Sequence, residues 1–185
     1  MRKTLFVLLA VMSVTVGTYA QKKVHYGLKG GLNISNSTAL FDYFRTGVYA
    51  GAFAEIKLKE RWAIQPEVVY YRNSGQGGYH IITDRKEHYL SVPVMIKYYI
   101  TPKFYLEAGP ELNYILSANE TVEGLTYNNI DLYNRWGLSG SAGLGYQLPY
   151  GFGVNARYSY SVPVKAYFPA VYNNTGKIGM TYTFK

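Results

Sequence analysis

The chain has 185 residues, with 19 Lys and Arg against 11 Asp and Glu, which gives a formal net charge of +8. It has no cysteine, which excludes a disulfide framework, thiolate metal sites, a thiol nucleophile and a cysteine-anchored lipoprotein. Hydrophobic residues make up 48%, aromatic residues 17% and charged residues 16%, so a disordered chain is excluded and either a soluble all-β domain or a protein that meets lipid is left.

The N-terminus has the layout of a cleaved secretory signal peptide. Arg2 and Lys3 precede an apolar run over residues 5–16, and small residues follow before a cleavage site. The run is too short for a transmembrane helix, which needs about 20 apolar residues. We therefore expect residues 1–20 to be removed and residues 21–185 to form one domain.

Eight later segments alternate between an apolar and a polar face. This period of two is typical of β-strands with one buried or lipid-facing side. In the first segment, for example, Leu28 and Leu32 alternate with Lys29 and Asn33, and no charged residue lies on the apolar face of any segment. In chain order the segments span residues 24–35, 48–57, 62–71, 89–100, 104–117, 135–147, 152–161 and 177–185.

The aromatic residues of the apolar faces distinguish a membrane barrel from a soluble sandwich or lipocalin-like barrel. A soluble protein turns its polar faces to water, and these carry scattered charges. Here the polar faces of the eight segments carry glycine, serine, threonine and isolated charges, which suits an enclosed lumen. The aromatics lie at two levels near the segment ends, as a bilayer selects: Tyr70, Tyr114, Trp136 and Tyr160 at one level, and Trp62, Tyr98, Phe104, Tyr146, Phe152 and Phe184 at the other.

The connections alternate in length. Short connections span residues 58–61, 101–103 and 148–150, whereas long ones span residues 36–46, 72–88, 118–134 and 162–175. The predicted fold is therefore all-β: an eight-stranded antiparallel up-and-down transmembrane β-barrel. In such barrels the short turns are periplasmic and the long loops extracellular, which predicts that both termini are periplasmic.

Three prolines lie inside predicted strands, where proline is disfavoured because it cannot donate to the ladder. We expect bulges or irregular pairing at Pro66, Pro93 and Pro110.

The same prolines carry a resemblance to a known family. The stretches that resemble the PorT-like outer-membrane β-barrel family are residues 47–55, 64–70, 90–93, 97–99, 101–110, 143–146 and 179–184. The resemblance implies an eight-stranded barrel of OmpX or OmpA size in a Gram-negative outer membrane. It also implies a link to protein secretion, with which the namesake of the family is associated.

The charged residues on the polar faces are the candidate site. They are Lys29, Glu55, Glu67, Lys97, Glu107, Glu111, Arg157 and Lys177. Glu107 and Glu111 share a face and could in principle perform acid–base chemistry. We interpret the eight instead as structural lumen charges that neutralise one another, because an unpaired buried charge is costly. A three-residue turn at 101–103 places Lys97 opposite Glu107, and we expect these two to form an ion pair.

No catalytic, metal or cofactor site is expected. Lipid A deacylase barrels use a His-x-Ser arrangement, but none of His25, His80 and His88 has a serine two positions on, and the nearest pair, His88 and Ser91, lies on opposite faces. No metal-ligand spacing or phosphate-binding glycine loop is present.

The functional hypothesis is a small non-enzymatic outer-membrane barrel with a structural role or a loop-mediated interaction role. The alternatives are a subunit or assembly factor of a protein-secretion machine and a narrow channel for ions or small solutes. Expected partners are outer-membrane lipid, the barrel-assembly machinery during insertion and an envelope protein bound through the loops. Nucleic acid is not expected, because the basic residues are dispersed.

Overall fold

The computed structural model describes residues 24–37, 43–77, 83–122, 124–128, 130, 135–162 and 173–184. The expected signal peptide lies outside these residues. No helix in these segments is long and apolar enough to cross a membrane. The strands are β1 (Val24–Ser37), β2 (Tyr43–Lys59), β3 (Trp62–Gly77), β4 (Thr83–Tyr99), β5 (Phe104–Val122), β6 (Leu125–Asn128), β7 (Trp136–Gln147), β8 (Phe152–Val162) and β9 (Asn173–Thr183).

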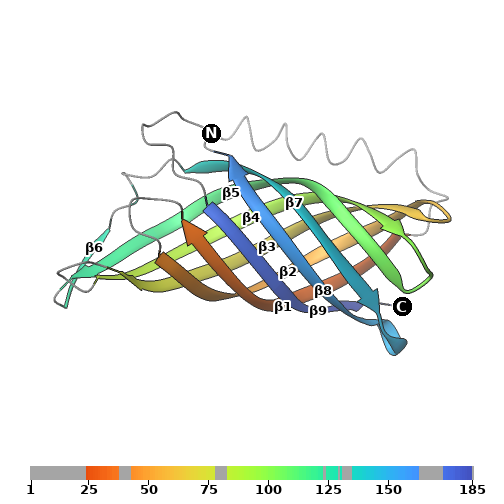
Figure 1. The fold of residues 1–185 in the computed structure, drawn as a ribbon, viewed down its shortest axis with the longest axis horizontal. Helices are drawn as coiled ribbons and strands as arrows, with labels where there is room; N and C mark the ends of the chain where they lie inside the picture. Colours follow the sequence, from red (N-terminus) through yellow and green to blue (C-terminus); the bar gives the residue numbers. More distant parts are fainter. Residues whose placement is uncertain are drawn as a thin grey trace.

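Eight of these strands form a closed antiparallel barrel (Figure 1). Each strand pairs with its neighbours in the chain, β9 pairs with β1, and the β4–β5 pairing closes the ring. The short strand β6 lies outside the ring and pairs with the far end of β5. The prediction of an eight-stranded up-and-down barrel is confirmed. A closed ring leaves no backbone edge to lipid, where unpaired amide groups would be costly.

The strands are staggered around the ring. A row of paired residues that starts at Val24 on β1 returns to the same strand at Ile34, ten positions further along. This stagger tilts the strands against the barrel axis and fixes the diameter of the lumen. The row runs through Ile56, Ile64, Ile96, Ala108, Ala142, Tyr158 and Gly176.

The short turns lie at one end of the barrel, as predicted. The turn between β7 and β8 includes Tyr150 and Gly151, with φ values of 62° and 87°. The left-handed conformation is easy for glycine because it lacks a Cβ atom, whereas Tyr150 adopts it at a cost.

The predicted long connections at the other end were too long, because much of their sequence is paired strand. β3 and β4 remain paired from Arg72 and His88 out to Gly77 and Thr83, and β5 continues to Val122. The period-two pattern fades there because these segments carry polar residues on both faces. As a result β3, β4, β5 and β6 extend beyond the other strands, at the left of Figure 1.

The three prolines interrupt the ladders without forming bulges. At Pro66 two residue pairs are missing between β3 and β2, and the pairing then resumes in the same register. Pro93 and Pro110 interrupt the β3–β4 and β4–β5 ladders in the same way. The expected irregular pairing is confirmed, but the bulges are not. The register shifts lie elsewhere, at Lys57/Lys59 and at His88/Tyr89.

Outward aromatic rings mark two rims. Trp62 packs on Tyr98 near the short turns, and Tyr114 packs on Trp136 near the other end, each pair with ring centroids 4.8 Å apart. At a rise of about 3.4 Å per residue and a tilt of about 40°, the span from Phe104 to Tyr114 covers about 25 Å of bilayer thickness. This matches the apolar band of an outer-membrane barrel.

Candidate functional site

The lumen contains charged side chains of both signs. All eight predicted lumen charges are buried, and Arg45 and Glu87 join them. Among the described residues, five buried cations therefore face five buried carboxylates. The ten are Lys29, Arg45, Lys97, Arg157 and Lys177, with Glu55, Glu67, Glu87, Glu107 and Glu111.

Arg157 on β8 is the centre of the largest cluster. Its guanidinium donates to both carboxylate oxygens of Glu67, at 2.7 and 2.9 Å, and its Nε donates to Glu107 at 2.8 Å. Lys29 donates to the same Glu67 at 2.9 Å, and Gln65 donates to it at 2.6 Å. Two cations thus neutralise two carboxylates, and the four residues come from four different strands, β1, β3, β5 and β8. Such a two-point arginine–carboxylate contact is strong and geometrically specific.

A second cluster surrounds Glu111 on β5. Lys177 donates to its Oε1 atom at 2.6 Å. Three serine hydroxyls, from Ser91, Ser141 and Ser159, donate to the same carboxylate at 2.8 to 3.0 Å. The carboxylate is therefore saturated with donors, which offsets its desolvation.

The third cluster, nearest the short turns, corrects the predicted Lys97–Glu107 ion pair. The register is as predicted, with Lys97 directly opposite Glu107. However, the Lys97 ammonium reaches past β3 to Glu55 on β2, at 3.0 Å, and Glu107 is bound by Arg157 instead. Lys57 and the Tyr99 hydroxyl also contact Glu55. Opposite positions on one ladder did not decide the pairing, because a side chain in a narrow lumen also reaches partners on strands beyond its direct neighbours.

The fourth cluster was not predicted from the sequence. Arg45 on β2 donates to Glu87 on β4 at 2.5 Å, and the Tyr89 hydroxyl donates to Glu87 at 2.9 Å. Both charged residues fell in predicted loops. The signal that could have identified them is an even spacing from inward residues of the same strand, because such residues share a face. Arg45, for example, is two residues from Gly47 and four from Tyr49.

Aromatic rings fill the space between the charged clusters. The Phe53 ring lies over Gly27, and the Tyr105 ring lies over Gly145, each directly across its ladder. The absence of a Cβ atom at both glycines makes room for the rings. Tyr71 and Tyr89 stack with centroids 4.8 Å apart near the fourth cluster. The lumen of the described barrel is a packed, polar core.

The arrangement does not suit the catalytic hypotheses raised by the sequence. Glu107 and Glu111 belong to different clusters, each with its own cation. Ser91 lies in the lumen bonded to Glu111, whereas His88 bonds Tyr70 on the outer face. No group of three or more His, Asp or Glu side chains in the described segments could hold a metal ion.

Comparison with known proteins agrees with the fold. Residues 19–162 match the family described as outer membrane protein beta-barrel domain. No curated protein matches the sequence.

Several solved structures share the architecture. Ail, the attachment invasion locus protein of Yersinia pestis, solved with the heparin analogue sucrose octasulfate, has a TM-score of 0.59 at 14% identity, covering 88% of this chain and 99% of Ail. Neisserial surface protein A has a TM-score of 0.60 at 15% identity, covering 86% of this chain and 97% of its own. The outer membrane enzyme PagL has a TM-score of 0.50 at 8% identity, covering 86% of this chain and 99% of PagL. At these identities the likeness concerns the fold alone.

Proposed function

The chain belongs to the outer membrane protein beta-barrel domain family, and from this premise we propose that it is a non-enzymatic barrel that presents its extended strands at the cell surface to another envelope protein. Its location is the outer membrane. In the proposed orientation the short turns and both termini are periplasmic, and β6 lies outside the cell. Outer-membrane lipid surrounds the barrel, and the barrel-assembly machinery acts on it during insertion.

The observation that supports this proposal is the sheet that extends past the aromatic rim at the long-loop end of the barrel. From Tyr114 to Val122, β5 continues for about 20 Å along the bilayer normal. β3 and β4 accompany it, and β6 adds a further strand whose side chains are all exposed, including Leu125 at 62% and Tyr127 at 51%. A barrel needs no such extension to span the bilayer. Exposed apolar and aromatic side chains on it favour a protein contact.

A direct test is photo-crosslinking in the native envelope. A photoreactive amino acid at Tyr127 should form an adduct with one recurring protein, identified by mass spectrometry. The matched control is the same probe at Lys103 in the β4–β5 turn, at the other end of the barrel, where that adduct should be missing. Equal adducts at both positions, or none at Tyr127, would contradict a surface interaction through this sheet.

A second candidate is a subunit or assembly factor of a protein-secretion machine. The positions of Pro66, Pro93 and Pro110 support it, because they are the residues on which the PorT-like resemblance depends. Each interrupts the ladder toward the preceding strand, so the three form one repeated feature. The same crosslinking experiment separates the two candidates. A secretion component as the recurring neighbour favours the second.

A further inference from the structure

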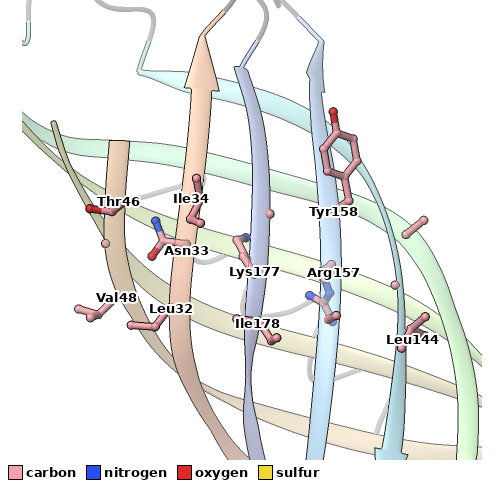
Figure 2. Close-up of a pocket in the computed structure, with 15 residues that line it drawn as sticks. Leu32, Asn33, Ile34, Thr46, Val48, Leu144, Arg157, Tyr158, Lys177 and Ile178 are labelled. Carbon is pink, nitrogen blue, oxygen red and sulfur yellow. The ribbon is translucent and has the colours of Figure 1, made fainter. Parts of the chain in front are cut away.

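A depression lies on the lipid-facing side of the barrel. It has a volume of about 820 Å³ and crosses five neighbouring strands, β2, β1, β9, β8 and β7 (Figure 2). Small outward residues form its floor, namely Gly176, Ala156 and Ala142, and larger apolar residues form its walls, among them Ile34, Ile178 and Leu144. The floor is low because three small residues lie on adjoining rows of β7, β8 and β9.

The depression has the direction and length of a lipid chain. It starts at Thr46, near the long-loop end of β2, and ends at Leu144, near the short-turn end of β7. Figure 2 shows Thr46 and Leu144 at opposite sides of the group. Four spacings of about 4.8 Å between the five strands give about 19 Å, about the length of a fatty acyl chain. The depression therefore runs obliquely across the strands, from the long-loop rim into the apolar band.

Two exposed cations lie beside the end of the depression that is near the long loops. Arg72 on β3 pairs directly with Val48, which lines the depression. Lys86 on β4 pairs with Ser74, so it is a diagonal neighbour of Arg72 on the same outer face. Both residues are exposed and lie just beyond the rim residue Tyr70. Arg72 donates to the Ser74 hydroxyl at 3.2 Å, and neither cation has a carboxylate partner among the described residues.

This lack of acidic partners distinguishes Arg72 and Lys86 from their neighbours. Arg45 on β2 and Arg85 on β4 are bonded to Glu87 and Glu120. An unpaired basic group at the bilayer surface attracts anionic lipid headgroups. A phosphate at this level could contact both side chains while an attached acyl chain occupies the depression.

We propose that Arg72, Lys86 and the depression form a binding site for the phosphorylated glycolipid of the outer leaflet, lipid A. Its phosphate would bind the two cations, and one acyl chain would lie over Gly176. The choice of this lipid rests on the orientation proposed above, which places the long-loop rim in the outer leaflet. The site itself can be tested in detergent, where orientation has no influence.

The experiment is native mass spectrometry of the folded protein in detergent, titrated with diphosphorylated lipid A. We expect one retained lipid. Arg72→Gln combined with Lys86→Gln should weaken retention about tenfold or more. The matched control, Arg61→Gln with Lys103→Gln, removes two exposed cations at the opposite end and should leave retention unchanged. The native protein should retain dephosphorylated lipid A as weakly as the Arg72 and Lys86 double variant retains lipid A.

Gly176→Leu tests the depression separately. A Cβ atom at Gly176 would meet only the Ile34 carbonyl oxygen, at 3.9 Å, so a larger side chain fits without disturbing the barrel. This variant should migrate like the native protein in heat-modifiability gels and yet retain less lipid A. Retention that is equal in all variants, or equal for lipid A and phosphatidylglycerol, would overturn the proposal.

Discussion

Lys97 lies directly opposite Glu107 on the β4–β5 ladder, yet its ammonium binds Glu55 on β2, on the other side of β3, at 3.0 Å. This relationship shows how the interior is stabilised. Carboxylates and cations from strands that are not adjacent in the ring bind one another, so the ion pairs tie together strands that share no hydrogen-bond ladder. β2 and β4, for example, are connected in this way through Glu55 and Lys97, and again through Arg45 and Glu87.

The first prediction concerns the partner of Lys97. Lys97→Met and Glu55→Gln should each destabilise the barrel, because each leaves a buried charge with fewer partners. Their double variant should recover part of the loss, with a coupling of about 1–2 kcal/mol. Urea unfolding in lipid vesicles measures these free energies. The matched cycle with Lys97→Met and Glu107→Gln should show weaker coupling, and a stronger one would contradict the pairing of Lys97 with Glu55.

The second prediction concerns Arg157, which binds two carboxylates. Arg157→Met should lower the free energy of unfolding by about 3–5 kcal/mol, since among the described residues Glu107 then keeps no cation and Glu67 keeps only Lys29. Adding Glu107→Gln should restore part of this loss. As a control, Lys59→Met removes an exposed cation and should change stability by less than about 0.5 kcal/mol. Similar losses in both single variants would mean that the central cluster contributes little.

The third prediction concerns the glycine under Tyr105. A Cβ atom at Gly145 would overlap the Tyr105 side chain, which supplies the three atoms nearest to it. Gly145→Ala should therefore destabilise the barrel by about 1–3 kcal/mol through overpacking. Tyr105→Leu in the same chain should relieve the overlap and so lower the cost of the alanine. Gly140→Ala, on the outer face of the same strand with nothing within 4 Å, is the control and should be tolerated.

The fourth prediction concerns conduction. The lumen is filled by the paired charges and by rings such as those of Phe53, Tyr99 and Tyr105, which are all buried. An eight-stranded barrel leaves an interior just wide enough for such side chains. In planar bilayers the protein should show no stable porin-sized conductance. Long-lived openings of uniform size would instead favour the channel hypothesis.

The sequence predicts the barrel well because each side chain on a spanning strand meets one of two very different environments. Leu28 and Lys29 must face lipid and lumen respectively, so the period of two is strong. The pattern weakens beyond Tyr114, where both faces of the sheet meet polar surroundings. That is why the ends of β3, β4 and β5, and the whole of β6, were predicted as loop.

The lumen charges were identified from the same alternation, but their partners were not. Register follows from turn length, so the position of Lys97 opposite Glu107 could be derived. Which carboxylate the ammonium reaches depends on the curvature of the closed ring and on the longer reach of Arg157. These are properties of the three-dimensional barrel that no single ladder contains.

The accessibility of the two ends of the barrel in living cells tests the proposed orientation. The chain has no cysteine, so single cysteines provide unambiguous labelling sites. Tyr127→Cys on β6 should react with a membrane-impermeant maleimide in intact cells. Lys103→Cys, in a short turn, should react only after the outer membrane is permeabilised. The reverse pattern, with Lys103→Cys labelled in intact cells and Tyr127→Cys protected, would contradict the proposed orientation and the surface role of the extended strands.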